Sequence, residues 1–387
     1  MAMAENKDKK VLNVPNLRFP EFEGEWEEHG LSEFLDFKNG LNPKPEKFGK
    51  GIKFISVMDI LNNTIITYDS IKACVDANNK EIDNYSVKMG DLLFQRSSET
   101  LEDVGRANVY MDEKPAIFGG FVIRGKKKGE YNPLFFKNLL ETPFSRRKII
   151  PMGAGAQHFN IGQEGLSKVK LYFAPINEQN KIAKILSLLD DRISTQNKII
   201  EKLETLIKGL RVHLTQKTDG YIVYLSEIAK IYQPQTISLS GFTEEGYLVY
   251  GANGIIGKYR EYNHRTEQIC ITCRGNTCGM VNYTKPKSWI TGNAMIVNTD
   301  DYQDKICKRY LYHYLSTYNF NSIISGSGQP QIVRSPLEKL KVKLPAILKQ
   351  KQIATFLDKL QNQIEINNNI LHLYLQQKQY LFRQMFI

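Results

Sequence analysis

The cysteines supply the most metal-like pattern in the chain. Cys270, Cys273 and Cys278 are spaced C-x2-C-x4-C, with His264 and Cys307 nearby in the sequence. Thiolate and imidazole are the usual ligands of structural zinc, but such sites normally combine two paired motifs, and here there is no second pair. The segment also has the pattern of a strand. We therefore predict no metal site.

A glycine-rich segment, 251–259, superficially resembles a phosphate-binding loop. Its glycines, Gly251 and Gly257, have one residue too many between them, and Tyr259 stands where Ser or Thr would bind magnesium. The chain also lacks a G-x-G-x-x-G loop between a strand and a helix. We predict no cofactor in this chain.

Catalytic motifs are absent from the sequence as well. It contains no H-E-x-x-H or G-x-S-x-G pattern, and no Asn/Asp-Pro-Pro-aromatic motif of an adenine methyltransferase. We therefore predict no catalytic residue and a chain that is not itself an enzyme. The alternative is a nuclease or methyltransferase that works alone with an unrecognised site.

Several loops carry side chains that suit base edges and phosphates, since Arg pairs well with guanine, and Asn or Gln with adenine. Arg96 and Arg274 each follow a strand-like segment, and Asn160 and Gln331 occupy aligned positions after a Gly-x-Gly turn. For any one of them, a structural role or a phosphate contact is the alternative. The predicted DNA-binding residues are Arg96, Ser97, Ser98, Arg124, Gln157, His158, Asn160, Asn253, Lys258, Arg274, Asn276, Thr277, Gln329, Gln331 and Arg334.

Two basic clusters could also grip a phosphate backbone. They are the lysine triplet 126–128 with Arg124, and the run 146–148. The alternative is that these residues form an ordinary solvated surface, and for the lysine triplet we favour this interpretation.

Composition sets the broader limits. The chain has 387 residues, 42% of them hydrophobic, and a formal net charge of +11. This excludes wholesale disorder and a disulfide scaffold and leaves room for two or three domains. The positive excess is spread along the chain, which suits a long polyanion or simply a basic soluble protein. Without a long apolar run or a secretory leader, we expect a cytoplasmic protein with reduced cysteines and no membrane partner.

An internal repeat organises the whole chain. An offset of 171 residues aligns 155–214 with 326–385 without a gap, and about a quarter of the aligned pairs are identical. The preceding segments correspond more loosely, as in Leu31-Ser-Glu and Leu225-Ser-Glu. The pattern therefore predicts, in each half, short β-rich segments followed by a late helix, a glycine loop and a long helix.

The two long helices carry apolar residues in columns spaced by seven. Over 178–215, twelve of the fifteen positions in three adjacent columns are apolar, and the polar interruptions recur in the second copy. We expect this wide stripe to be buried and the two helices to pack on each other; an ordinary core helix in one large domain is the alternative. The predicted pairing residues are Ile182, Leu189, Ile193, Ile200, Leu203, Ile353, Leu360, Ile364 and Leu371.

The predicted fold class is a mixed α/β (α+β) repeat of two globular domains separated by an antiparallel two-helix coiled coil with pseudo-two-fold symmetry. The paired helices would act as a spacer between two reading heads. The expected boundaries are an N-terminal arm 1–30, a first recognition domain 31–175, a central helix 176–217, a second recognition domain 218–345 and a C-terminal helix 346–387.

Specific motifs resemble those of a known family. The opening segment 16–26 (NLRFPEFEGEW) followed by Leu31-Ser-Glu, the strand 90–94 (GDLLF), and the twice-repeated glycine and glutamine loop leading to Gln…Ile-Ala…Leu resemble bacterial type I restriction-modification specificity (S) subunits. The resemblance covers nearly the whole chain.

The resemblance implies a non-catalytic DNA-binding subunit of a bacterial defence complex. Two target recognition domains would each read one half of a bipartite double-stranded target, and the helices would set the spacing. Helix surfaces outside the seam would bind two methylation (M) subunits, with restriction (R) subunits in the full complex. S-adenosylmethionine, ATP and magnesium would belong to those partners. A purely structural adaptor is a further alternative.

Overall fold

The structure is a computed structural model that describes residues 13–326 and 328–387. The predicted N-terminal arm therefore lies partly outside the described residues. The chain divides into two compact units. The first ends at Thr195 and also contains 371–387, and the second is 196–370, so each unit holds part of both long helices.

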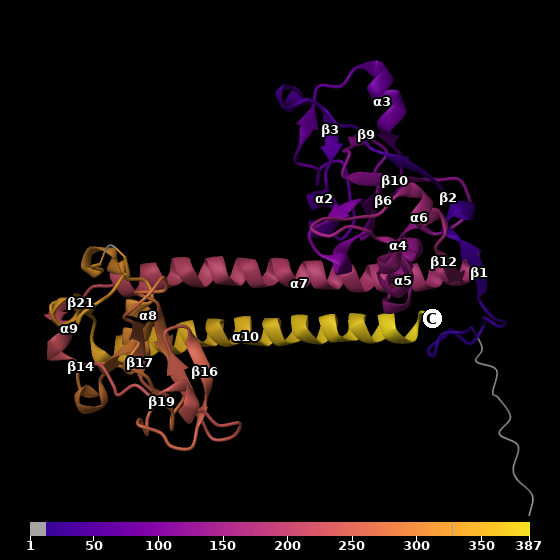
Figure 1. Ribbon diagram of the computed structural model, residues 1–387. Helices are drawn as coiled ribbons and strands as arrows, with labels where there is room; N and C mark the ends of the chain where they lie inside the picture. The colour runs from indigo at the N-terminus through magenta and orange to yellow at the C-terminus, as the bar shows by residue number, and fades with distance from the viewer. Residues whose placement is uncertain (1–12, 327) are drawn as a thin grey trace, which may run out of the picture. The chain divides into compact units, whose positions relative to one another are not determined.

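The first unit is built on a four-stranded antiparallel sheet in the order β2-β10-β6-β8 (Figure 1). A second sheet, β4-β3-β9-β5, contains a parallel pair, β3 and β9. Two small antiparallel pairs, β1-β12 and β11-β7, complete the unit. The strands are β1 Glu27–Gly30, β2 Leu35–Asn39, β3 Phe48–Ile55, β4 Cys74–Val75, β5 Ser86–Val87, β6 Leu92–Gln95, β7 Ser97–Ser98, β8 Ala107–Val109, β9 Ala116–Phe118, β10 Val122–Lys127, β11 Phe159–Asn160 and β12 Lys170–Phe173.

The second unit repeats this plan. Its main sheet has the order β14-β20-β17-β18, β15 and β19 form the parallel pair, and β13-β21 match β1-β12. The same strand order in both units confirms the predicted repeat of mixed α/β units. The strands are β13 Tyr221–Tyr224, β14 Lys230–Tyr232, β15 Tyr247–Gly251, β16 Gly254–Tyr259, β17 Ile269–Thr272, β18 Val281–Tyr283, β19 Trp289–Ile290, β20 Ala294–Asn298 and β21 Lys341–Leu344.

Short helices connect the strands, and none of the described helices is long and apolar enough to cross a membrane. The α-helices are α1 Leu31–Phe34, α2 Val57–Asn62, α3 Asn79–Tyr85, α4 Pro133–Glu141, α5 Pro143–Ile149, α6 Gln163–Ser167, α7 Ile176–Gln216, α8 Lys308–Leu315, α9 Arg334–Glu338 and α10 Ile347–Gln384. Single 3-10 turns occur at Pro45–Lys47, Leu101–Asp103, Ile150–Met152, Leu225–Glu227, Leu239–Gly241, Asp300–Tyr302 and Phe320–Ile323.

Strand β6 shows why the central strands are almost wholly apolar. Leu92 and Phe94 face a core that includes α4 and the start of α7, whereas Leu93 faces the core beneath β9 and α2. Because successive side chains point to opposite faces, a strand covered on both faces loses the polar alternation of an exposed sheet. Strand β17 of the second unit is buried on both faces in the same way.

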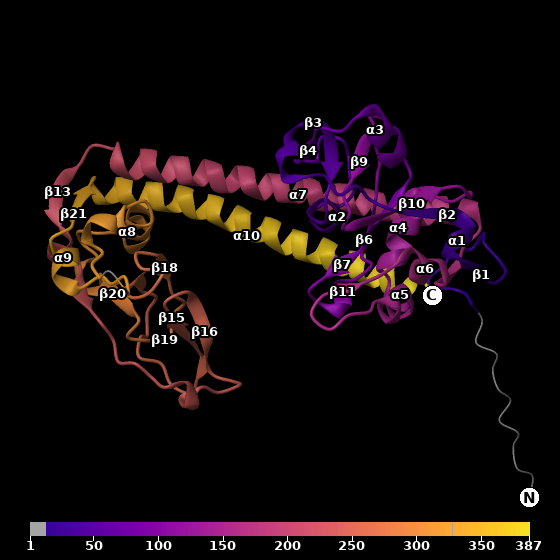
Figure 2. The same ribbon diagram turned by 45° about the horizontal axis from the view of Figure 1, so that its top comes forward.

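The long helices pair antiparallel inside each unit, and both views show them side by side (Figure 2). In the first unit, Asp190 of α7 forms an ion pair at 2.5 Å with Lys378 near the end of α10. In the second unit, Arg211 near the end of α7 donates to Gln361 of α10 at 2.8 Å. The predicted antiparallel pairing is confirmed.

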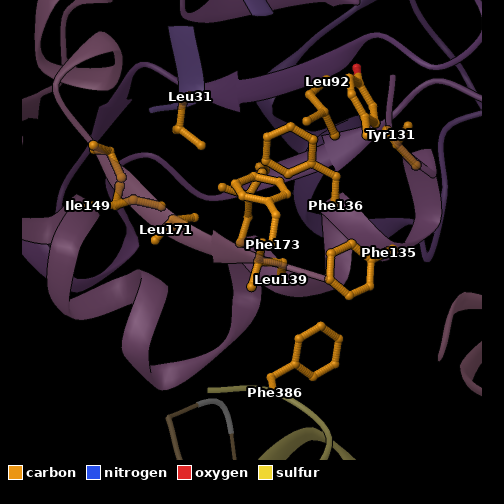
Figure 3. Close-up of a cluster of buried hydrophobic side chains, with 14 of the residues drawn as sticks. Leu31, Leu92, Tyr131, Phe135, Phe136, Leu139, Ile149, Leu171, Phe173 and Phe386 are labelled. Atoms are coloured by element: carbon orange, nitrogen blue, oxygen red, sulfur yellow. The ribbon is translucent and has the colours of Figure 1, made fainter. Parts of the chain in front are cut away.

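Part of α10 completes the core of the first unit. Phe386 stacks on Phe135 of α4 with their ring centroids 5.4 Å apart, and it lies edge-on to Trp26. Figure 3 shows the rings of Phe386 and Phe135 beside the cluster around Phe136 and Phe173. Trp26 of the opening motif thus packs against Phe386, which lies 360 positions later in the chain, just after the end of α10.

The seam is narrower than the sequence predicted. Two columns are buried or partly buried, and these hold all the predicted pairing residues: Ile182, Leu189, Ile200, Ile353 and Ile364 are buried, and Ile193, Leu203, Leu360 and Leu371 are partly buried. The third column stays exposed along α7, as at Ile185, Ile199 and Leu206, and on α10 Phe356 is exposed whereas Ile370 is partly buried. The expectation that the whole stripe is buried was wrong, because a two-helix seam covers only the facing columns.

Candidate nucleic-acid interface

Polar residues of the first unit gather where β6 ends. Arg96 follows β6, and Ser97 of β7 donates a hydrogen bond from its hydroxyl to the side-chain oxygen of Asn160 on β11. The preceding turn leaves Gln157 and His158 exposed. Ser98 instead is buried and accepts from the Thr100 amide at 3.2 Å. The strand pair therefore brings Arg96, Ser97 and Asn160 together.

The second unit presents a corresponding edge. Ser325 and Gln331 exchange backbone hydrogen bonds at 2.9 and 2.8 Å, matching Ala154 and Asn160 at the aligned positions. Gln331 forms a β-bridge with Arg274, and both are exposed. Gln329 is exposed on the same turn, whereas Arg334 lies on α9, where its guanidinium pairs with Glu338 at 2.7 Å.

The backbone register corrects one sequence equivalence. The amide of Arg96 donates to Phe121 at 2.9 Å, and the corresponding bond of the second unit runs from Cys273 to Asn293 at 3.0 Å. Cys273, one residue before Arg274, therefore occupies the place of Arg96. The two arginines lie near equivalent strand ends but not at equivalent positions.

The glycine-rich segment 251–259 forms a β-hairpin. Gly251 of β15 pairs with Gly254 of β16, so Asn253 lies exposed in the turn and Lys258 lies exposed on β16. Thr277 donates its hydroxyl hydrogen bond to the Asn253 side chain at 2.5 Å, and Asn276 beside it is exposed. The hairpin thus joins Asn253 to the loop that follows β17.

The structure corrects the prediction for Arg124. Its side chain is 9% exposed, donates to the Ser86 carbonyl and lies over the Phe118 ring at 5.3 Å. Burial lowers the pKa of its guanidinium from the ordinary value. A strand that is covered on both faces turns this arginine inward, so it is not available to a surface ligand.

The other basic residues divide between surface and structure. Lys126 is exposed, and Lys128 pairs with Asp36 at 3.1 Å. Arg146 is partly buried and donates to the carbonyls of Glu102 and Val104, both at 2.7 Å. It therefore holds the 101–104 turn in place, while Arg147 and Lys148 remain exposed.

Two glycines have structural roles that we did not predict from the sequence. In the first unit, the Gly120 carbonyl accepts from the Arg96 guanidinium at 3.2 Å, and a Cβ on Gly120 would collide with the Asn42 side chain. In the second unit, the Gly292 carbonyl accepts from Gln233, and a Cβ there would collide with Thr236. The only sequence signal is a glycine just before a strand in each half.

The cysteines do not converge. Cys270 and Cys273 belong to different hydrophobic clusters because they lie on opposite faces of the sheet. Burial raises the pKa of the Cys270 thiol to about 12. His264 instead shares a hydrogen bond of 2.8 Å with the Tyr232 hydroxyl. Among residues 13–326 and 328–387, no three His, Cys, Asp or Glu side chains are grouped so that they could hold a metal ion.

Comparison with known proteins gives a consistent result. The family model described as the type I restriction modification DNA specificity domain matches residues 23–205 and again 221–373. A Methanocaldococcus jannaschii protein named as the MjaX specificity subunit of a type I restriction enzyme is 25% identical, over 92% of each chain. The MjaVIII specificity subunit of the same organism is 24% identical, over 93% of this chain and 91% of the other.

A solved structure supports the fold. The S subunit of a type I restriction-modification system from M. genitalium aligns with a TM-score of 0.67 and 16% identity, over 97% of this chain and 99% of the other. With family matches over both units and most of the sequence, the chain belongs to the type I restriction-modification specificity subunit family.

Proposed function

We propose that this chain is the non-catalytic subunit that gives a type I restriction-modification complex its DNA sequence specificity. Each unit reads one half of a bipartite target in double-stranded DNA, and the paired helices set the distance between the halves. The polar strand ends described above supply the base and phosphate contacts.

One observation carries this proposal. The two units have the same strand order and the same backbone hydrogen bonds at the strand ends, but different side chains are exposed there. The loop after β6 offers Arg96 and Asn160, and the matching loop of the second unit offers Arg274 and Gln331. A shared frame with different base-reading side chains is what two different half-sites require.

The helices have a second task in this proposal. The exposed apolar column on α7, which includes Ile185, Ile199 and Leu206, would dock the methylation subunits. Exposed leucine and isoleucine side chains at heptad spacing are typical of a helix face that a partner covers.

The chemistry would then reside in the partners. Two methylation subunits would bind S-adenosylmethionine and methylate adenine N6, and restriction subunits would use ATP and magnesium. The described residues of this chain contribute recognition and assembly.

The decisive experiment expresses the chain with its methylation partner and maps N6-methyladenine in the host DNA. The expected result is one bipartite motif with a fixed spacer. Exchanging residues 31–150 for those of another family member should change one half of the motif only. A change in both halves, or methylation without a preferred sequence, would contradict the proposal. A purified chain that turns over DNA without partners would favour an enzyme instead.

A further inference from the structure

The first unit has an apolar groove beside Arg96 that the proposed function leaves unassigned. Its volume is about 420 Å³, and its lining includes Phe48, Phe54, Val57, Met58 and Phe121. Three of these side chains are unusually exposed for their type: Phe121 at 68%, Met58 at 61% and Phe48 at 45%. Exposed apolar side chains grouped around one groove indicate a binding surface.

The groove is joined to the polar residues of the strand end. Arg96 donates from its backbone amide to the Phe121 carbonyl at 2.9 Å and from its guanidinium to the Gly120 carbonyl at 3.2 Å. Arg96 thus holds the loop that forms one wall. Exposed Lys44, next to Pro43 of the lining, adds positive charge at the rim. The apolar surface therefore adjoins cationic groups, which suits a polyanion better than an apolar protein partner.

The second unit shows that this position varies while its frame does not. Asn293 is the backbone equivalent of Phe121, since the Cys273 amide donates to it at 3.0 Å, and it too is exposed. Gly120 and Gly292 each come directly before the variable residue. A Cβ at either glycine would collide with a neighbouring side chain, that of Asn42 or Thr236. An apolar ring in one unit and an amide in the other fits a position that encodes sequence.

We infer that the groove receives the C5 methyl group of a thymine in the half-site read by the first unit, with Phe121 and Met58 as specificity-determining residues. The thymine methyl is the apolar group that a base pair presents in the major groove. The other base-edge groups there are hydrogen-bond donors and acceptors, which the apolar side chains lining this groove cannot bind. The inference rests on the proposed function, because it assumes that the first unit reads DNA.

The test uses the complex with the methylation partner and a duplex carrying the motif found by methylation mapping. Each thymine of the first half-site is replaced in turn by deoxyuridine, which removes only the methyl group. At one position we expect the wild-type complex to bind deoxyuridine about fourfold more weakly, the ratio for one buried methyl group. Phe121→Ala and Met58→Ala should bind the thymine duplex more weakly and show a ratio near one.

Met89→Ala is the matched control, because Met89 is also 56% exposed but does not line the groove. It should retain the wild-type ratio. Wild-type ratios near one at every thymine, or full discrimination in both groove variants, would overturn the inference while leaving a bipartite motif intact. Loss of assembly with the methylation subunit in the groove variants would instead assign the groove to that protein. A wild-type complex without any bipartite motif would refute the proposed function itself.

Discussion

Gln196 of α7 donates its side-chain amide to the side-chain oxygen of Asn367 on α10 at 2.6 Å and to the Asn367 backbone carbonyl at 3.0 Å. The two residues are 171 positions apart, which is the offset of the repeat, so each is the counterpart of the other. In an antiparallel pair, counterparts meet where the helices cross at the centre of the pairing. A polar contact among apolar columns at this point fixes the register of the two helices.

Gln196→Leu should lower the stability of the chain by about 1 kcal/mol, because it removes the hydrogen bond and leaves the Asn367 amide against an apolar side chain. Combining it with Asn367→Leu should recover part of that loss, which urea denaturation would measure as coupling between the two sites. Asn197→Leu, at the exposed neighbouring position, is the control and should have little effect. Strictly additive effects of the two seam substitutions would argue against the contact.

Gln179 and Gln350 should make the two units sensitive to the same substitution. Both side chains are buried. Gln179 accepts a hydrogen bond from the Asn132 amide at 3.0 Å and donates to the Ala174 carbonyl at 2.8 Å. Gln350 likewise accepts from the Cys307 amide at 2.9 Å and donates to the Pro345 carbonyl at 2.8 Å. Replacing either by Glu should destabilise its unit by about 2 kcal/mol or more, because a carboxylate cannot donate to the carbonyl and would be buried. Thermal unfolding would measure the change. A Glu variant as stable as the wild type would contradict this role.

Glu178 lies at a position where the two copies differ. Its carboxylate is fully buried, pairs with Arg18 at 2.7 Å and accepts from the Trp26 indole at 3.3 Å. Arg18→Ala should destabilise the first unit by about 3 kcal/mol, since it leaves a buried carboxylate without its cation. Lys349 is the counterpart of Glu178 and is exposed, so Lys349→Ala serves as the control. Equal effects of the two substitutions on the unfolding midpoint would refute this prediction.

A buried histidine makes the second unit sensitive to acid. His313 lies between Arg211 of α7 at 3.1 Å and Asp358 of α10 at 2.8 Å, and Arg309 also pairs with Asp358. Burial, with a smaller effect of Arg211, lowers the pKa of His313 below 6.5. Burial opposes ionisation of Asp358, but hydrogen bonds from His313 and Arg309 bring its pKa below 3.8.

Both shifts have the same sign for stability. The unfolded chain binds a proton more readily than the folded one at each site, so stability is present above the unfolded pKa and falls as the pH drops. We expect the unfolding midpoint to fall as the pH drops below about 6.5 through His313, and again below about 3.8 through Asp358. His313→Gln should remove the first decline and keep the second. A variant with the wild-type pH profile would contradict the prediction.

The exposed column of α7 can be tested apart from folding. Leu206 is 49% exposed in the second unit, so Leu206→Glu should leave the unfolding midpoint nearly unchanged. Affinity for the methylation subunit should fall about tenfold or more, because docking would bury a charge. Thr205→Glu, one residue earlier and also exposed, adds the same charge outside the column as a control. Analytical ultracentrifugation of the mixed chains would measure assembly, and unchanged affinity would exclude this face.

The sequence predicted the long helices well and their exposed faces poorly. A repeat of seven without Pro or early Gly is a local property, so α7 and α10 follow from it. Whether Ile199 faces α10 or solvent depends on which columns turn toward the partner helix, and three apolar columns do not specify that. The offset of the repeat was informative because it aligns Gln196 with Asn367, and these two equivalent residues contact each other in the helix pair.

The loops were harder to predict for physical reasons. Arg124 is polar in sequence but buried, because both faces of β10 are covered and its guanidinium finds a carbonyl within the fold. Cys273 rather than Arg274 matches Arg96, which only the hydrogen-bond register reveals. The groove around Phe121 is assembled from segments some 60 residues apart, and no local pattern predicts such a surface.

The stacking of Phe386 on Phe135 has a consequence for biosynthesis. The first unit cannot complete its core until the ribosome has made every residue of the second unit and then the end of α10. While translation continues, Trp26, Phe135 and the early turns of α7 expose apolar surface that has no permanent cover. The nascent chain therefore has a long interval in which a chaperone, or an already folded assembly partner, can shield that surface.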